Sequence, residues 1–460
     1  APSHAEVGAP VARAQQQPVF SKPVSISPKS DSRADGSVAI SNDGSKIFSA
    51  VTRNKFRGNT VTGTAMSRVW TPGKGQSKVK GVGSAGGSDD AIVSVNGSGK
   101  KAWFAYHESS GNRGRVAVRL QVGKKLKKPK SFKVKRSNTV PWTLEQSKNG
   151  STVLLTYTAQ RTSKEYARVW QAGKGWSPEQ RIDTGHAPPE RFSVSADGST
   201  ILIASTTQNN QVRSQLWTRA AGWQAPLALA TSPSGAVVRS SLAPDGRSAV
   251  VAWSVPPAGY GQRAAVSSRT MNEGVWGPAQ LLIEDASIRA VATSGGDSMF
   301  LVERSDLTQS GFSDLVQYVL RNDPVAPLLQ VGPVLERLGG KRFLSAAKLA
   351  IANDGSATIA MWSAGQWSGG RKNLVLSAAS WTREAGASPV TGVRLPGDSS
   401  AFDFAASSNA RRYVAQDVTG GRKSGVFAGH GQTRWSSPCT VHALNRLWPA
   451  TPRASRATNG

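Results

Sequence analysis

Arginine and aromatic side chains recur in the polar segments that separate the apolar runs of this chain. The guanidinium fork of arginine binds carboxylate, sulfate or phosphate through paired hydrogen bonds, and an aromatic ring offers a flat face to a sugar or a base. Segments presented by a rigid scaffold are common places for such residues. The candidate ligand-binding residues are Arg53, Arg57, Arg113, Tyr260, Arg263, Trp367 and Arg371. The alternative is that they are ordinary solvated loop residues.

A basic run forms a second candidate site. The segment 124–136 (KKLKKPKSFKVKR) holds eight basic residues in thirteen. One interpretation is a charged outer edge strand, where lysine blocks pairing with another sheet. The other is a patch that binds a polyanion, and the sequence favours neither. The patch consists of Lys124, Lys125, Lys127, Lys128, Lys130, Lys133, Lys135 and Arg136.

Carboxylates that could act as a catalytic pair are scarce. Glycoside hydrolysis needs two carboxyl groups about 5–10 Å apart. The candidates in polar segments are Glu108, Glu165, Glu303 and Asp306. Asp403 differs, because it lies on the predicted first strand of a repeated unit. The repeats described below predict a ring of sheets, and Asp403 is expected to point into the central channel of that ring. None of the five falls in a recognisable motif, so each is predicted to be a turn or ion-pair residue, and no catalytic residue is assigned.

Metal and cofactor chemistry has no support in the sequence. The single cysteine, Cys439, excludes paired-cysteine zinc sites and an internal disulfide. The five histidines lie far apart and lack metal-ligand spacing. No nucleophile elbow, P-loop or dinucleotide fingerprint is present. We therefore expect neither a metal nor a cofactor.

The elements that must position these residues are repeated. Turn pairs recur every 48 to 59 residues, and a short β-branched or apolar run follows each of them. Repetition at this period with strand-like composition predicts an all-β propeller of four-stranded antiparallel blades. Eight repeats are visible, and seven blades are the alternative because the eighth is degenerate. The turn pairs are Asp43-Gly44, Ser98-Gly99, Asn149-Gly150, Asp197-Gly198, Asp245-Gly246, Gly295-Gly296, Asp354-Gly355 and Ser408-Asn409.

Two features of the repeat can be assigned structural roles. The turns are predicted to be two-residue hairpins, in which glycine supplies the positive φ that such turns require. The third run often ends in tryptophan, as at Trp70, Trp170 and Trp217. These rings are predicted to pack between blades, and aromatic platforms for sugars are the alternative.

The repeat resembles two groups of known propellers. The units NDGSKIFSA, ADGSTILIAS and PDGRSAVVAW resemble the WD-like repeat of TolB-type bacterial proteins. The units GKGWSPEQ, AGWQAP and GVWGPAQ are similar to the blade ends of secreted sialidase-like propellers. The resemblance covers roughly residues 37–440 and implies a propeller fold. It implies no particular function, because this scaffold carries binding, hydrolytic and docking proteins alike.

The sialidase resemblance does not extend to catalytic residues. That family's Asp-box has the pattern S-x-D-x-G-x-T-W between the third and fourth strands. The segment 195–200 (SADGST) is one residue too short and falls between the first and second runs. The family's arginine triad and its nucleophile pair have no counterparts that can be placed.

The domain organisation follows from composition. Residues 1–36 are polar and expected to be flexible, except that 19–27 could form a strand that closes the ring. Residues 37–440 form the propeller, and 441–460 form a flexible basic tail. No apolar run is long enough to span a membrane. The start at Ala1, without a methionine, fits an exported protein whose signal peptide has been removed, and a cloned fragment is the alternative. On the first interpretation we expect a secreted or envelope-associated bacterial protein.

Net charge bears on the partner. Lysine and arginine number 57 against 28 acidic residues, which gives a formal charge of +29. Such a charge favours anionic partners and opposes self-association, so we expect a monomer. The leading hypothesis is a non-catalytic binding or docking module for a glycan, an anionic polymer or a protein. A sialidase-like glycan hydrolase and an envelope-associated scaffold are the alternatives.

Overall fold

The structure, a computed structural model, consists of β-strands joined by turns and short connections in the part of the chain that it describes. Within this part, no helix is long and apolar enough to cross a membrane. The described residues are 19–20, 24–25, 36–57, 60–71, 74–83, 88–110, 113–132, 139–159, 164–182, 192–207, 209–232, 236–255, 264–305, 312–321, 328–339, 342–368, 371–382, 386–394, 402–410, 412–417 and 425–430.

The strands form antiparallel sheets that follow one another along the chain, here numbered 1 to 8. Sheet 1 contains β3 (Gly36–Ile40), β4 (Ile47–Arg57), β5 (Thr60–Thr71), β6 (Gly75–Gln76) and β7 (Lys80–Gly81). Sheet 2 contains β8 (Ser88–Val95), β9 (Lys101–Ser110), β10 (Arg113–Val122), β11 (Lys125–Leu126) and β12 (Lys130–Phe132). Sheet 3 contains β13 (Thr139–Gln146), β14 (Thr152–Ala159), β15 (Lys164–Gln171), β16 (Gly175–Trp176) and β17 (Gln180–Ile182). Sheet 4 contains β18 (Phe192–Val194), β19 (Thr200–Thr206), β20 (Gln211–Thr218), β21 (Gly222–Trp223) and β22 (Leu227–Thr231).

The remaining sheets repeat this order. Sheet 5 contains β23 (Val237–Leu242), β24 (Ser248–Val255), β25 (Ala265–Asn272), β26 (Val275–Trp276) and β27 (Gln280–Glu284). Sheet 6 contains β28 (Ala286–Thr293), β29 (Asp297–Ser305), β30 (Phe312–Arg321) and β31 (Leu328–Gly339). Sheet 7 contains β32 (Arg342–Ile351), β33 (Ala357–Ser368), β34 (Arg371–Thr382), β35 (Gly386–Ala387) and β36 (Thr391–Arg394). Sheet 8 contains β37 (Phe402–Ala406), β38 (Arg412–Asp417) and β39 (Gly425–His430), completed by β1 (Val19–Phe20) and β2 (Val24–Ser25).

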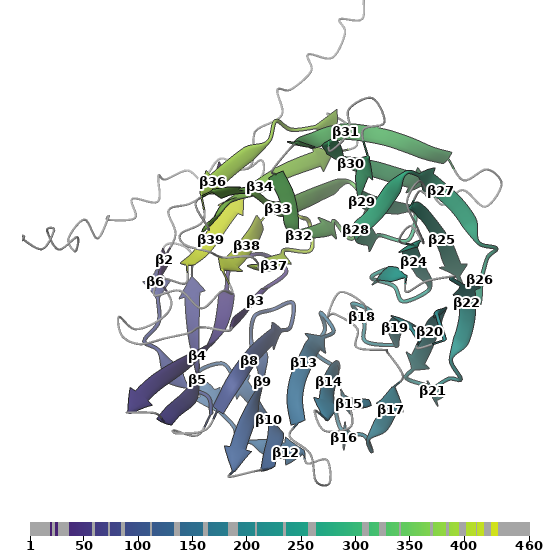
Figure 1. Cartoon of the computed structure of the whole chain (residues 1–460). Coiled ribbons are helices and arrows are strands. Elements are labelled where there is room, and N and C mark those ends of the chain that lie inside the picture. Colours follow the sequence, from purple (N-terminus) through teal and green to yellow (C-terminus); the bar gives the residue numbers. More distant parts are fainter. Residues whose placement is uncertain are drawn as a thin grey trace, which may run out of the picture.

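The sheets stand around a central opening in sequence order, with the first strand of each innermost (Figure 1). Buried apolar clusters lie between successive sheets: Phe48 of sheet 1 packs with Phe104 of sheet 2, for example. A further cluster joins sheet 8 to sheet 1 through Val414 and Val38. Strands buried on both faces explain the nearly continuous apolar runs of the sequence. The architecture is an all-β propeller, as the repeats predicted.

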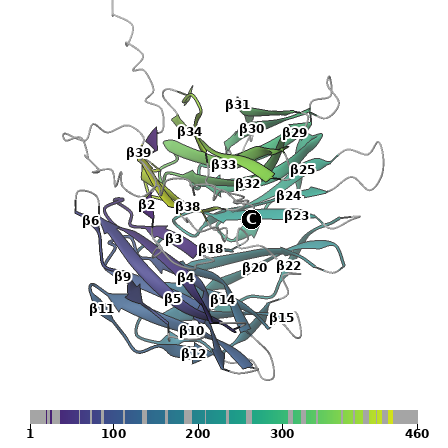
Figure 2. The ribbon, with the colours of Figure 1, turned by 60° about the vertical axis from the view of Figure 1, so that its left-hand side comes forward.

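The two ends of the described chain meet in sheet 8. Within the segment expected to close the ring, β1 and β2 both pair antiparallel with β39. Val19 lies opposite His430, and Val24 lies opposite Val426. Figure 2 shows β39 and β2 beside the purple strands of sheet 1. The polypeptide therefore contributes residues from both ends to one sheet.

The repeated turns are longer than the predicted two-residue hairpins. In sheet 1 the Ser41 amide donates to the Lys46 carbonyl at 3.0 Å, and the Gly44 amide donates to the Ser41 carbonyl at 2.9 Å. Four residues therefore separate Ser41 from Lys46, and Gly44 follows a β-turn with φ of 66°. Longer hairpin loops are commonly built this way. In sheet 8 the positive φ of 52° belongs to Ala410, one residue beyond the predicted pair.

Backbone hydrogen bonds also link each of several turns to the next sheet. The Asn42 amide donates to the Gly97 carbonyl at 2.9 Å, and the Gly97 amide donates to the Lys148 carbonyl. The Ser408 amide donates to the Asn42 carbonyl at 3.2 Å, which joins sheet 8 to sheet 1. These turns serve the scaffold, since their polar groups bind one another.

Substitution of a turn glycine tests whether the turns pack closely against neighbouring sheets. Gly198 has φ of 69°, and a Cβ there would lie 2.6 Å from Thr152 Oγ1. Gly222 has φ of 74° and open space around it. We expect Gly222→Ala to lower the free energy of unfolding by about 1–2 kcal/mol through backbone strain alone. Gly198→Ala should lose at least about 1 kcal/mol more because of the added steric overlap. Urea unfolding of both variants measures the difference, and equal losses would contradict the close packing of the turn.

Candidate functional site

The central channel is lined by the innermost strands of all the sheets described. Residues alternate along these strands: in β23, Val237, Arg239 and Ser241 are partly accessible, and the residues between them are buried. Alternate side chains of a strand point to opposite sides, so one set faces the channel and the other packs between sheets. The resulting cavity has a volume of about 760 Å³. This lies within the range of about 300–1,000 Å³ that is usual for small-molecule sites.

Polar side chains in the channel bridge neighbouring innermost strands. An innermost strand has one unpaired edge, so its amide and carbonyl groups need other partners. In several sheets a side chain of the preceding sheet supplies them. The bridges are Ser37 Oγ with the Val93 amide (3.2 Å), the Glu145 carboxylate with the Val194 amide, Arg239 Nε with the Arg289 carbonyl (2.9 Å), Ser241 Oγ with the Thr293 amide (3.1 Å) and Asp403 Oδ2 with the Val38 amide (2.7 Å).

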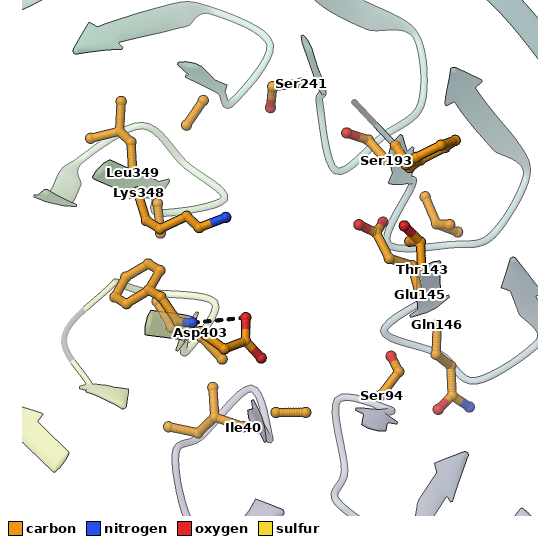
Figure 3. Close-up of a pocket in the computed structure, with 18 of the residues that line it drawn as sticks. Ile40, Ser94, Thr143, Glu145, Gln146, Ser193, Ser241, Lys348, Leu349 and Asp403 are labelled. Atoms are coloured by element: carbon orange, nitrogen blue, oxygen red, sulfur yellow. Dashed lines mark hydrogen bonds between the residues drawn. The ribbon is translucent and has the colours of Figure 1, made fainter. Parts of the chain in front are cut away.

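Two carboxyl groups and one ammonium group face each other in the channel. Figure 3 shows Lys348 reaching inward from β32, with Asp403 on its own side and Glu145 across the cavity. Burial raises the pKa of Glu145 to about 8, although the Val194 amide, Lys148 and Lys348 oppose the shift. Burial also raises the pKa of Asp403, against the Val38 amide and Lys348. At neutral pH the Glu145 carboxyl group is therefore mostly protonated.

The sequence located one of these residues and missed two. Asp403 lines the channel, where it was expected. Glu145 and Lys348 were not nominated, although a signal for them exists. Glu145 lies five residues before the turn glycine Gly150, and Lys348 lies seven before Gly355. At such odd offsets an innermost strand faces the channel, so a charged residue there stands out.

Five of the seven predicted binding residues lie on paired strands, not in the loops where they were expected. Arg53 and Arg57 lie on β4, because the β4–β5 hairpin extends to the pair Arg57 and Thr60. Arg113 begins β10 and lies opposite Ser110. Trp367 and Arg371 lie on the long hairpin of β33 and β34. Paired strands thus replace most of each segment that was read as a loop. The side chains of these five residues, and all of Tyr260 and Arg263, lie outside the described residues.

The predicted carboxylates are partly accounted for by ion pairs. Glu108 accepts from Arg115 Nε at 2.5 Å, and Glu303 pairs with Arg289. Glu165 is buried. Asp306 lies outside the described residues. For Glu108 and Glu303 the ion-pair interpretation is the one that the geometry supports.

Three tryptophan rings, those of Trp103, Trp170 and Trp176, pack against one another between sheets 2 and 3. Trp103 of sheet 2 lies 5.2 Å from Trp170 and 5.4 Å from Trp176 of sheet 3, measured between ring centroids. Phe132 lies 5.4 Å from Trp176. Trp103 is 5% exposed, so its ring offers no open face to a sugar, whereas Trp170 and Trp176 are partly buried.

The basic run lies on the outer edge of sheet 2. Both β11 and β12 pair with β10, so Lys125 and Lys130 belong to the outermost strands. The Lys80 ammonium of sheet 1 donates to the Lys124 carbonyl at 3.1 Å, which places the two edges side by side. Lys133, Lys135 and Arg136 lie outside the described residues. We define the lysine surface as the exposed residues Lys74, Lys78, Lys80, Lys124, Lys125, Lys127, Lys128 and Lys130.

A metal site has no support in the described residues, which contain no group of three or more His, Cys, Asp or Glu side chains able to hold an ion. The charged groups of the channel are of both signs and come from different sheets. They suit a polar organic ligand better than a cation.

Comparisons with known proteins give likenesses of fold. No family model matches the sequence, and no curated protein matches it. The β-propeller domain of the Trilobed protease from Pyrococcus furiosus is similar at 12% identity, with 76% of this chain and 99% of that chain covered and a TM-score of 0.46. Kuenenia stuttgartiensis hydrazine synthase shows 12% identity, coverage of 73% and 94%, and a TM-score of 0.45. TolB from Acinetobacter baumannii shows 15% identity, coverage of 55% and 57%, and a TM-score of 0.31. At these values neither a family nor an activity follows for this chain.

Proposed function

We propose that this protein is a non-catalytic binding module that holds a linear anionic polymer on its lysine surface. The observation that carries the proposal is eight exposed lysines on the adjoining outer edges of sheets 1 and 2. Closely spaced ammonium groups attract phosphate or sulfate polymers and release their counterions. The paired strands beneath hold the lysine backbones in place before the polymer arrives.

The charge of the chain is concentrated in these two sheets. Residues 44–144 contain 21 of the 57 lysines and arginines but only three of the 28 acidic residues. No aspartate or glutamate occurs between Asp43 and Asp89. A concentration of one sign on one side of the molecule produces a directed field, whereas a solubilising charge needs no such placement.

Edge protection alone does not account for the lysines. If lysine were needed to block pairing between outer edges, the other sheets should carry it as well. The outer strands β22 (LALAT) and β27 (QLLIE) contain neither lysine nor arginine, and β17 (QRI) and β36 (TGVR) contain one arginine each and no lysine. The lysines of sheets 1 and 2 are therefore better explained by a partner than by protection of an edge.

The test is a fourfold substitution, Lys124→Ser, Lys125→Ser, Lys127→Ser and Lys128→Ser. We expect affinity for polyphosphate or heparin at low salt to fall at least about tenfold, and the slope of log affinity against log salt to decrease by up to about 3. The matched control removes four exposed cations from other sheets: Lys164→Ser, Lys174→Ser, Arg181→Ser and Arg247→Ser. Equal losses in both variants, or an affinity independent of salt, would contradict the proposal. Release from fluorogenic glycoside or sialoside panels would contradict its non-catalytic part.

We further propose that the sheets are eight blades of one closed ring and that the protein works as an exported monomer. The eight-blade count is supported by eight successive sheets and by the pairing of β1 and β2 with β39. We also propose that the repeats are related to the WD-like repeat of TolB-type bacterial proteins.

A further inference from the structure

Three serine hydroxyls, here called the serine ring, line the channel, and one of them, that of Ser241, also belongs to the bridges. Figure 3 shows the hydroxyls of Ser94, Ser193 and Ser241 turned into the cavity from β8, β18 and β23. Each serine lies five residues before the positive-φ glycine of its turn, so the three occupy one level of the channel. Hydroxyl groups both donate and accept, and a ring of them matches a molecule that carries several hydroxyls itself.

A buried hydroxyl at the same wall has no hydrogen-bond partner among the residues that the structure describes. Thr143 lines the channel on β13 and is 5% exposed, and its Oγ1 makes no hydrogen bond. A buried polar atom without a partner costs free energy, so water or a ligand group is expected to satisfy it. The channel is wide and polar enough to admit either.

Basic side chains outnumber acidic ones in the channel lining, although burial lowers the pKa of Lys148. Lys348, Arg239 and Lys148 line the channel, and the opposing acidic groups are Glu145 and Asp403. Glu145 carries little negative charge at neutral pH, for the reason given above. The Asp403 carboxylate already accepts from the Val38 amide at 2.7 Å and from the Phe404 amide at 2.9 Å. The Lys348 side chain reaches into the cavity, where it acts on both carboxyl groups and would also meet an incoming anion.

We propose that the central channel binds a small hydroxylated carboxylate of the hexuronate type, with its carboxylate on Lys348 and its hydroxyls on the serine ring. Glu145 faces the same space and meets the ligand as a neutral donor. Its surroundings are Lys348 from β32, Arg239 from β23, Asp403 from β37, Lys148 from its own turn and the Val194 amide from β18. A bound carboxylate favours the protonated form of Glu145, so binding is coupled to proton uptake.

This site is separate from the lysine surface and does not depend on the proposed polymer binding. Lys348 lies on an innermost strand, whereas the lysine surface occupies outer edges. The fourfold serine variant should therefore keep its affinity for the channel ligand. Failure of either proposal leaves the other open to its own test.

The experiment compares three glucose-related sugars of similar size by calorimetry: D-glucuronate, D-glucose and D-glucosamine. We expect glucuronate to bind at least tenfold more tightly than the other two. Lys348→Met should remove at least tenfold of that affinity, whereas Lys174→Met, at an exposed position outside both proposed sites, should leave it unchanged. Equal binding of the three sugars, absence of glucuronate binding, or equal losses in the two variants would each overturn the proposal.

The wild-type protein provides a test that does not depend on a variant folding. Glucuronate affinity should fall as the pH rises from 6.5 to 9, since Glu145 ionises with a pKa of about 8 and then repels the ligand carboxylate. Proton uptake, read from the heat of binding in buffers of different ionisation enthalpy, should be greatest near the upper end of that range. Glu145→Gln should remove both effects. A flat pH profile in the wild type would overturn the proposed arrangement.

Discussion

Replacing Trp103 by alanine is expected to lower the free energy of unfolding by about 3–5 kcal/mol while leaving polymer binding intact. The ring is 5% exposed and contacts Trp170 and Trp176 of the neighbouring sheet. Removing it leaves a cavity between two sheets that rigid backbones cannot close. Guanidinium unfolding measures the loss, and polyphosphate binding at a temperature well below the transition measures function.

Two control variants distinguish packing from recognition. Trp103→Phe keeps most of the buried ring and should cost less than half as much. Trp276→Ala removes a partly buried ring at the edge of another cluster and should also cost less. If Trp103→Ala instead weakened glycan or polymer binding with little change in stability, the tryptophans would have to be regarded as ligand platforms.

Replacing Glu145 by glutamine should remove a pH-dependent loss of stability. The folded-state pKa of about 8 exceeds the ordinary value of 4.5, so the folded protein holds an extra proton between these two values. Stability contributed by this proton is present below pH 4.5 and is lost as the pH rises toward 8. The slope is at most about 1.4 kcal/mol per pH unit. Between pH 5 and 8 we expect the wild type to lose at least about 2 kcal/mol relative to Glu145→Gln.

Asp197, a carboxylate in a turn, provides a control whose pKa is shifted in the opposite direction. Burial raises the pKa of Asp197, but hydrogen bonds from the Ser199 amide and the Ser195 and Ser199 hydroxyls outweigh it, so the pKa is lowered overall. Its stabilising effect is present above the unfolded value and lost on acidification. Asp197→Asn should therefore not change the slope between pH 5 and 8. Parallel unfolding profiles of wild type and Glu145→Gln across that window would show that Glu145 is ionised in the folded protein.

The sequence was sufficient for the order of the strands, because that order is set by local chemistry. The turn glycines adopt the positive φ that their spacing indicated, with Gly44 at 66° and Gly198 at 69°. The basic run could be placed on an outer strand, since it follows the third run of its repeat. Hairpin lengths were underestimated, because polar and charged residues such as Arg53 and Lys55 also fit the paired, outward parts of strands.

The candidate site could not be assembled from the sequence alone. Glu145, Lys348 and Asp403 belong to sheets 3, 7 and 8, and no local pattern relates them. They share a cavity because every sheet turns its first strand toward the same axis. Their protonation depends on the same closure, since burial in the channel is what raises the pKa of Glu145 and of Asp403. Local sequence patterns determined the repeat. Only the arrangement of the sheets around one axis determined which charged side chains share the channel.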